Sequence, residues 1–186
     1  MKINIDTIVK DNENLIREKS QDVKLPLSDE DREILQSLYT YVLDSTDPSK
    51  IEEENLRPAV GIAAIQIGIN KKLIAVILKG EDGEIEYQYA LANPKIVSYS
   101  IEEAYLASGE GCLSVEKDHE GYVYRHRRIK VKGYDMLTDK EVVIKASDYL
   151  AIVLQHELDH FNGTLFYDHI NKKDPFFVKK DAFRID

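Results

Sequence analysis

The first regular pattern of apolar and polar positions along the chain predicts a helix that begins after Ser28. Ser28 suits the N-cap position, and the acidic residues that follow it favour the first turn of a helix. We expect this helix to end near Asp44, and its apolar residues recur at helical spacing at Ile34, Leu35, Leu38, Tyr41 and Val42. The stretch from Asp44 to Pro58, with two prolines and three consecutive glutamates, is typical of a solvated loop.

Shorter apolar runs separated by turn residues predict β-strands through the middle of the chain. We expect strands at residues 73–78, 85–92 and 94–99, after a short helical turn at residues 61–66. A later hairpin is expected to pair residues 129–134 with residues 141–145. The basic residues near that hairpin alternate with apolar ones, which indicates a half-exposed strand and not a nucleic-acid surface: Arg128, Ile129, Lys130, Val131 and Lys132.

A second helix is predicted near residue 150, and its apolar flanks indicate that it lies in the core. Ser147 suits its N-cap, Asp148 suits its first turn, and Asn162-Gly163 suits a left-handed stop at its C-terminus. Short strands with few helical crossovers predict an α+β fold. In that fold, antiparallel or mixed β-sheets would pack around this central helix.

The composition predicts one domain spanning residues 1–186, because a chain of this length with 43% hydrophobic residues can bury a sizeable core. The single cysteine excludes an intramolecular disulfide framework, and the N-terminal segment lacks the apolar run of a signal peptide. We therefore expect a cytoplasmic protein. No apolar stretch approaches the length of a membrane span, and the net charge of −9 argues against general nucleic-acid binding.

The strongest chemical signal is the segment His156-Glu157-Leu158-Asp159-His160 within the second predicted helix. At about 100° per residue, His156 and His160 lie on one face and can bind one cation, with Glu157 about a quarter turn away. This pattern is typical of a metal site with a general base attached. Catalytic sites of this kind normally use three protein ligands, so the third must come from elsewhere in the chain.

Two regions offer a third ligand. Downstream, Asp168 and His169 are conceivable ligands, and a site completed by Asp168 would indicate a zinc endopeptidase with Cys112 merely buried. Upstream, the only cysteine stands in the segment Glu110-Gly111-Cys112-Leu113-Ser114. Gly111 removes bulk beside the thiol, and a metal on the histidines would keep the thiolate deprotonated. We therefore favour a His-His-Cys site.

A third block, residues 59–66, combines small side chains with a terminal glutamine: Ala59-Val60-Gly61-Ile62-Ala63-Ala64-Ile65-Gln66. Small residues allow close backbone approach, and the Gln66 amide can donate to a developing oxyanion. In this order the three blocks resemble the peptide deformylase family, which carries G-x-G-φ-A-A-x-Q, then E-G-C-L-S, then H-E-x-D-H. The last two segments occur here without change, and the likeness runs from about residue 55 to residue 170. The chain is most similar to the deformylases with an enlarged N-terminal region and no long C-terminal helix.

The resemblance implies a hydrolase that removes the N-formyl group from the formyl-methionine of newly made polypeptides and releases formate. It implies one divalent metal per chain, with Fe²⁺ expected and Zn²⁺, Ni²⁺ or Co²⁺ conceivable in a purified sample. Nascent formylated polypeptides are the implied partners, together with a transient ribosome contact. No membrane partner and no specific nucleic acid are expected.

The resemblance also assigns roles to individual residues. It makes Cys112, His156 and His160 the metal ligands, and Glu157 the catalytic acid and base. The Gln66 amide and the Leu113 N–H become the oxyanion donors, while Glu110 pairs with Arg125. The implied methionine pocket consists of Val60, Gly61, Tyr149, Ile152 and Val153.

Two positions depart from the family pattern. Ala59 replaces the first glycine of its segment, which questions a backbone conformation with positive φ there. Because of this departure, a second interpretation stays open, in which the chain is a non-catalytic relative of the enzyme that only binds peptide or metal. Tyr124 replaces the proline of a V-P-R segment that ends at Arg125, and we expect it to alter the rim of the substrate groove.

Overall fold

The computed structural model describes residues 1–186, and its elements confirm the predicted α+β class. Its α-helices are α1 (Asp29–Asp44), α2 (Pro48–Glu54) and α3 (Asp148–His160). Its strands are β1 (Gly61–Ala63), β2 (Leu73–Lys79), β3 (Ile85–Tyr99), β4 (Glu103–Leu106), β5 (Arg125–His126), β6 (Arg128–Asp135), β7 (Lys140–Ser147) and β8 (Phe183–Ile185). Short 3₁₀ helices are η1 (Ile5–Thr7), η2 (Asn14–Arg17), η3 (Ala64–Ile67) and η4 (Phe166–His169).

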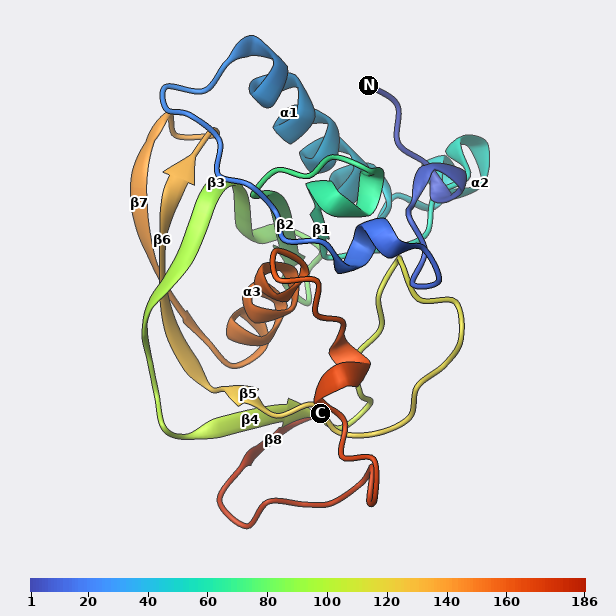
Figure 1. Cartoon of the computed structure of the whole chain (residues 1–186), viewed down its shortest axis with the longest axis vertical. Coiled ribbons are helices and arrows are strands. Elements are labelled where there is room, and N and C mark those ends of the chain that lie inside the picture. The colour runs from blue at the N-terminus through green and yellow to red at the C-terminus, as the bar shows by residue number, and fades with distance from the viewer.

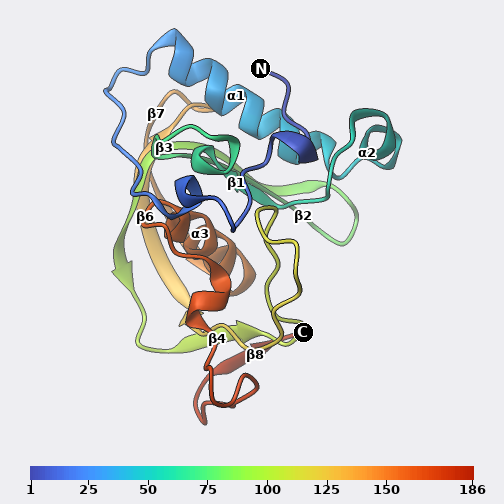
Figure 2. The same cartoon turned by 45° about the vertical axis from the view of Figure 1, so that its right-hand side comes forward.

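A five-stranded antiparallel sheet in the order β1-β2-β3-β6-β7 separates two hydrophobic cores. Successive side chains of a strand point to opposite faces. In β2, Ile74 and Val76 accordingly join the core around α3, whereas Ala75 and Ile77 join the core around α1. Burial on both faces explains the continuous apolar sequence of β2. Figures 1 and 2 show α3 inside the curve of the long strands and α1 across the other side.

The predicted helix ends are largely confirmed. The Ser28 side chain accepts a hydrogen bond from the Asp31 N–H at 3.1 Å and so caps α1. Beyond α3, Gly163 has a φ of 66°, and a Cβ there would lie 2.1 Å from the Arg17 carbonyl oxygen, so glycine is required. Ser147 occupies the N-cap position of α3, but its side chain makes no capping bond.

Three local predictions were wrong. The presumed loop between residues 44 and 58 contains α2, because Asp47 caps that helix and Pro48 occupies its first turn, where a proline is favourable. Residues 85–99 form one continuous strand, β3. Its pairing register with β6 shifts near Asn93, but the strand does not break there. The expected helical turn at residues 61–66 begins as strand β1 and only then becomes η3.

A second, smaller sheet in the order β5-β4-β8 closes the end of the molecule next to α3 (Figure 1). In it β8 runs parallel to β4, with Leu106 opposite Ile185. These three strands are short and were not predicted from the sequence. The predicted hairpin is present as β6 and β7, with Ile129 and Val131 buried and Arg128 and Lys130 exposed. No helix is both long and apolar enough to cross a membrane.

Candidate active site

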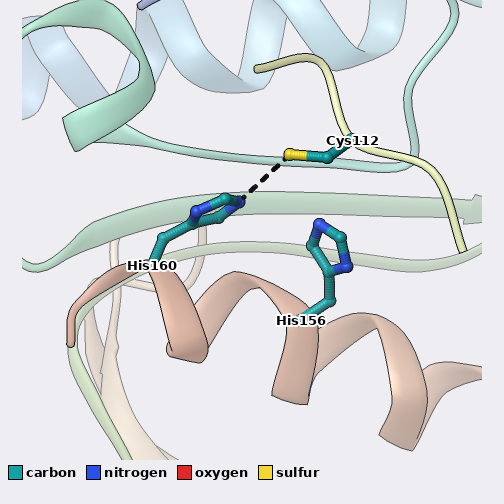
Figure 3. A group of neighbouring side chains, drawn as sticks. All are labelled: Cys112, His156 and His160. Carbon is teal, nitrogen blue, oxygen red and sulfur yellow. Dashed lines mark hydrogen bonds between the residues drawn. The ribbon is translucent and has the colours of Figure 1, made fainter. Parts of the chain in front are cut away.

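Three side chains from two distant parts of the chain converge beside α3 (Figure 3). His156 and His160 project from the same face of the helix, and Cys112 comes from the loop between β4 and β5. The candidate ligand atoms all lie within 4.8 Å of one another, and Cys112 Sγ is 3.5 Å from His160 Nε2. A thiolate and two imidazoles at this separation could hold one divalent metal, and three protein ligands are the number typical of catalytic zinc-type sites. The predicted His-His-Cys group is therefore assembled.

A buried ion pair orients His156. Its Nδ1 lies 2.7 Å from Glu110 Oε2, so that nitrogen donates to the carboxylate and Nε2 is the nitrogen left for a metal. Arg125 holds the same carboxylate by two bonds, from Nε at 2.6 Å and from Nη2 at 3.0 Å. Burial alone would raise the pKa of Glu110, but the bonds from His156 and Arg125 lower it to about 2. The Glu110–Arg125 pair expected from the sequence is present, with side chains 4% and 3% exposed.

The electrostatic environment favours the thiolate form of Cys112. Burial by itself would raise the pKa of the thiol, but His160 and His156 outweigh burial and lower this pKa well below its ordinary value. The thiolate is the form that binds metal. The surroundings of Cys112 are therefore those of a ligand and not those of an inert core cysteine.

Glu157 is buried next to these ligands, with 4% of its surface exposed. Its Oε2 has no hydrogen-bond partner in the protein. Burial raises the pKa of this carboxyl above its ordinary value, against the opposing effect of the two histidines. Its other oxygen packs against Gly61, where a Cβ would lie only 2.5 Å from Glu157 Oε1. A carboxyl group with a raised pKa and an unpartnered oxygen suits proton transfer.

Two potential oxyanion donors lie on the other side of the site. Gln66 Oε1 accepts the Ala63 N–H at 2.8 Å, which fixes the amide and directs Nε2 toward Cys112 Sγ at 3.5 Å and Ser114 Oγ at 3.3 Å. The Leu113 N–H donates to no acceptor within the protein. Both groups therefore lie beside the thiolate, and the Leu113 N–H is free to donate a hydrogen bond to a negatively charged oxygen of a bound molecule.

A cavity of about 710 Å³ opens onto this group of residues. All five residues of the predicted methionine pocket line it: Val60, Gly61, Tyr149, Ile152 and Val153. Two apolar lining residues were missed by the sequence analysis, namely Leu106 and Ile185. No local pattern could have identified them, because they reach the cavity only through the parallel pairing of β4 with β8.

Two residues considered as alternative ligands lie outside the group. Asp168 pairs with Arg17 and accepts the Leu165 N–H at 2.8 Å. His169 Nε2 lies 2.8 Å from Asp159 Oδ2. The structure thus gives no support to a site completed by Asp168.

The two departures from the family pattern have simple structural outcomes. Ala59 does not have a positive φ, and its N–H donates to Ser45 Oγ at 3.1 Å, so alanine is accommodated without backbone strain. The Tyr124 hydroxyl accepts the Lys179 N–H at 3.1 Å and so anchors the segment that leads to β8. Tyr124 is absent from the lining of the main cavity, and the prediction that it alters the groove rim stays a prediction.

Comparison with known proteins gives a consistent result. The family model described as polypeptide deformylase matches residues 5–176. The chain is 48% identical to peptide deformylase 2 of Geobacillus stearothermophilus, over 98% of each chain. It is 45% identical to peptide deformylase 2 of Bacillus subtilis (strain 168), over 99% of each chain.

Solved structures show the same fold. The peptide deformylase of Ehrlichia chaffeensis in complex with actinonin has a TM-score of 0.72 and 29% identity, covering 94% of this chain and 92% of that chain. The class I type b peptide deformylase of Acinetobacter baumannii, crystallised with Met-Ala-Ser bound, has a TM-score of 0.70 and 28% identity. That match covers 91% of this chain and 100% of the other.

Proposed function

Because the chain belongs to the polypeptide deformylase family, we propose that its substrates are nascent polypeptides beginning with formyl-methionine, from which it releases formate. The observation that carries this proposal is the Cys112, His156 and His160 group, with the buried Glu157 carboxyl beside it. The Met-Ala-Ser peptide bound by the Acinetobacter relative has the form of the expected product and supports the substrate assignment.

The donor set fits a single divalent metal. Cys112 provides a sulfur, His156 provides Nε2 because Nδ1 is engaged by Glu110, and His160 Nε2 faces the same sulfur. When bound, a divalent cation supplies Lewis acidity, which polarises a carbonyl oxygen and lowers the pKa of water toward neutrality. Fe²⁺ is the metal we propose, in line with the family, although a sulfur and two nitrogens would also accept Zn²⁺, Ni²⁺ or Co²⁺.

Glu157 is the proposed acid and base. Its carboxylate takes a proton from the attacking water and then delivers that proton to the nitrogen of the departing methionine. The raised pKa of Glu157 favours holding the proton between these two events. Negative charge that develops on the formyl oxygen is stabilised by hydrogen bonds from Gln66 Nε2 and the Leu113 N–H. The fixed Gln66 amide and the unpaired Leu113 N–H support these roles.

The methionine side chain is proposed to occupy the part of the cavity formed by Val60, Ile152 and Val153, with Tyr149 at the entrance. Tyr149 is 41% exposed, whereas Ile152 is 2% exposed and Val153 is 5% exposed. This gradient from an exposed aromatic ring to buried aliphatic residues suits a flexible apolar side chain that enters from solvent. Gly61 also lines this cavity, and its lack of a side chain makes room for Glu157.

Formate release tests the substrate proposal. Purified protein that carries a confirmed divalent metal should release formate from formyl-Met-Ala-Ser and leave acetyl-Met-Ala-Ser intact, because an acetyl methyl group adds bulk at the reacting carbon. Absence of release with metal bound would favour the non-catalytic alternative. Iron-, nickel- and zinc-loaded samples compared in the same assay would identify the metal that supports turnover.

The zinc endopeptidase alternative makes a different prediction for Cys112→Ser. If Cys112 were only a buried residue, this variant would keep its metal and would cleave internal peptide bonds. In the proposed site the variant loses a thiolate ligand, and metal content should fall. Metal analysis after gel filtration distinguishes the two results.

The cellular setting is also a proposal. The family and the substrate are consistent with a cytoplasmic enzyme that acts as one catalytic domain spanning residues 1–186. Transient contact with the ribosome would bring the site to nascent chains. The basic residues of the C-terminal segment are candidates for that contact, among them Lys172, Lys173 and Lys180.

A further inference from the structure

A continuous chain of hydrogen bonds runs from the proposed metal ligand His156 to the protein surface. His156 Nδ1 donates to Glu110, and Arg125 donates to Glu110 through Nε and Nη2. The third arm of the guanidinium, Nη1, donates to Asp159 Oδ2 at 2.8 Å. The same Asp159 oxygen lies 2.8 Å from His169 Nε2. Donors and acceptors therefore alternate along five side chains.

The middle of this chain is the most buried part, and burial decreases from Arg125 outward to His169. The Glu110 and Arg125 side chains are 4% and 3% exposed, whereas those of Asp159 and His169 are 25% and 36% exposed. Water cannot replace a lost partner at the inner end, so each buried group depends on the next one for its orientation. The outer two residues, Asp159 and His169, have no role in the mechanism described above.

We propose that Asp159 and His169 are positioning residues that determine how tightly His156 holds the metal. This inference rests on the proposed function only in taking His156 as a metal ligand. Arg125 carries a positive charge that draws electron density away from Glu110, and the Asp159 carboxylate offsets that charge. With Asp159 in place, Glu110 remains a strong acceptor for the His156 N–H, which raises the basicity of the ligating nitrogen.

His169 acts one step further out. Asp159 Oδ2 already accepts from Arg125, and a carboxylate oxygen can only accept, so His169 must donate from Nε2. This donor holds the Asp159 side chain, which is on the last turn of α3, toward Arg125. Loss of the donor frees the carboxylate to rotate into solvent and leaves Arg125 Nη1 with a poorly held partner.

Metal affinity measured by chelator competition tests this assignment, with Ni²⁺ as the probe and full-length protein as the sample. Asp159→Asn keeps the size of the side chain but removes its charge, and its Ni²⁺ dissociation constant should rise about 10-fold, at the low end of the effect of outer-shell substitutions. His169→Ala should weaken binding in the same direction by a smaller factor. His169→Gln, which retains an N–H donor, should restore part of the loss.

A matched control separates positioning from general damage. Glu103→Gln removes a carboxylate that lines the same surface cavity as His169 but pairs with Lys179, and its Ni²⁺ affinity should equal that of the wild type. The absorption spectrum of Co²⁺-loaded protein gives a second readout, because it should shift in Asp159→Asn and not in Glu103→Gln.

Two results would overturn the proposal. One is wild-type Ni²⁺ affinity in both Asp159→Asn and His169→Ala, and the other is His169→Gln binding no better than His169→Ala. If Asp159→Asn fails to fold, the His169 pair decides the question alone. None of these measurements uses a formylated substrate, so an inactive enzyme with the expected affinities would refute the proposed function and leave this inference intact.

Discussion

Replacement of Gly61 by alanine tests how the site places its proposed acid and base. A Cβ on Gly61 would lie 2.5 Å from Glu157 Oε1 and 2.8 Å from Glu157 Cδ, whereas ordinary contact begins at 3.4 Å. The Glu157 carboxylate must therefore move by about 0.9 Å, the difference between the contact limit and the shortest distance. Misplacement of a reacting group by about 1 Å can reduce the rate about 10²-fold. We expect kcat of Gly61→Ala to fall by that factor.

The assay is formate release at saturating formyl-Met-Ala-Ser, with metal content measured on the same sample. Metal content should stay at the wild-type level, because Gly61 contacts no metal ligand among its close neighbours. Crowding of the buried carboxylate should also lower the free energy of unfolding by about 1–3 kcal/mol. A second substitution, Glu157→Asp, shortens the acid by one methylene and should recover stability in the Gly61→Ala background. Activity should not recover, because the shorter carboxylate is withdrawn from the reacting atoms.

One result would refute this reasoning directly. If Gly61→Ala retained wild-type kcat and stability with metal bound, the carboxylate would not depend on the space that Gly61 leaves. The close packing of Gly61 against Glu157 would then have no part in positioning the acid.

Two further predictions concern other parts of the fold. Ile185→Ala removes an apolar wall of the cavity and should raise KM for formyl-Met-Ala-Ser by at least about 10-fold with little change in kcat, because the loss of even one methylene contact in an apolar pocket costs about 1–3 kcal/mol. Val178→Ala, which lies outside the cavity, serves as the control, and an equal effect of the two variants would contradict the assignment. Burial would raise the pKa of Asp31, but the hydrogen bonds from Lys71 and Ser28 lower this pKa overall. The stability that Asp31 contributes is therefore complete above its unfolded pKa of about 3.9 and is lost as the pH falls through the lower folded pKa. Urea unfolding of wild type and Asp31→Asn should therefore show a stability difference at pH 7 that shrinks toward pH 2, and a difference independent of pH would be inconsistent with this linkage.

Local spacing made much of the site predictable from the sequence. His156, Glu157 and His160 are neighbours on one helix, so their relative placement follows from helical geometry alone. Cys112 could be favoured from its glycine neighbour and from the lack of a better downstream ligand. The resemblance then strengthened the role of Gln66 and supplied the Glu110–Arg125 pair, and the structure places these side chains around the same point.

Other features depended on contacts between distant segments. Ile185 lines the cavity only because β8 pairs with β4, and a three-residue strand carries no periodic signal of its own. The contact between Gly61 and Glu157 joins residues that lie far apart in the sequence. Within the presumed loop, prolines favour a loop prediction, but Pro48 stands in the first turn of α2, where a proline favours a helix.

The central claim is that Glu157 transfers the proton at a metal site formed by Cys112, His156 and His160. Its most direct test is formate release by Glu157→Gln, with the metal content of the same sample determined. Glutamine keeps the size of the side chain but cannot accept the proton, and general acid–base catalysis contributes about 10²–10⁴-fold. We predict full metal occupancy and a fall in kcat of that size. Turnover near the wild-type rate with metal bound would contradict the account.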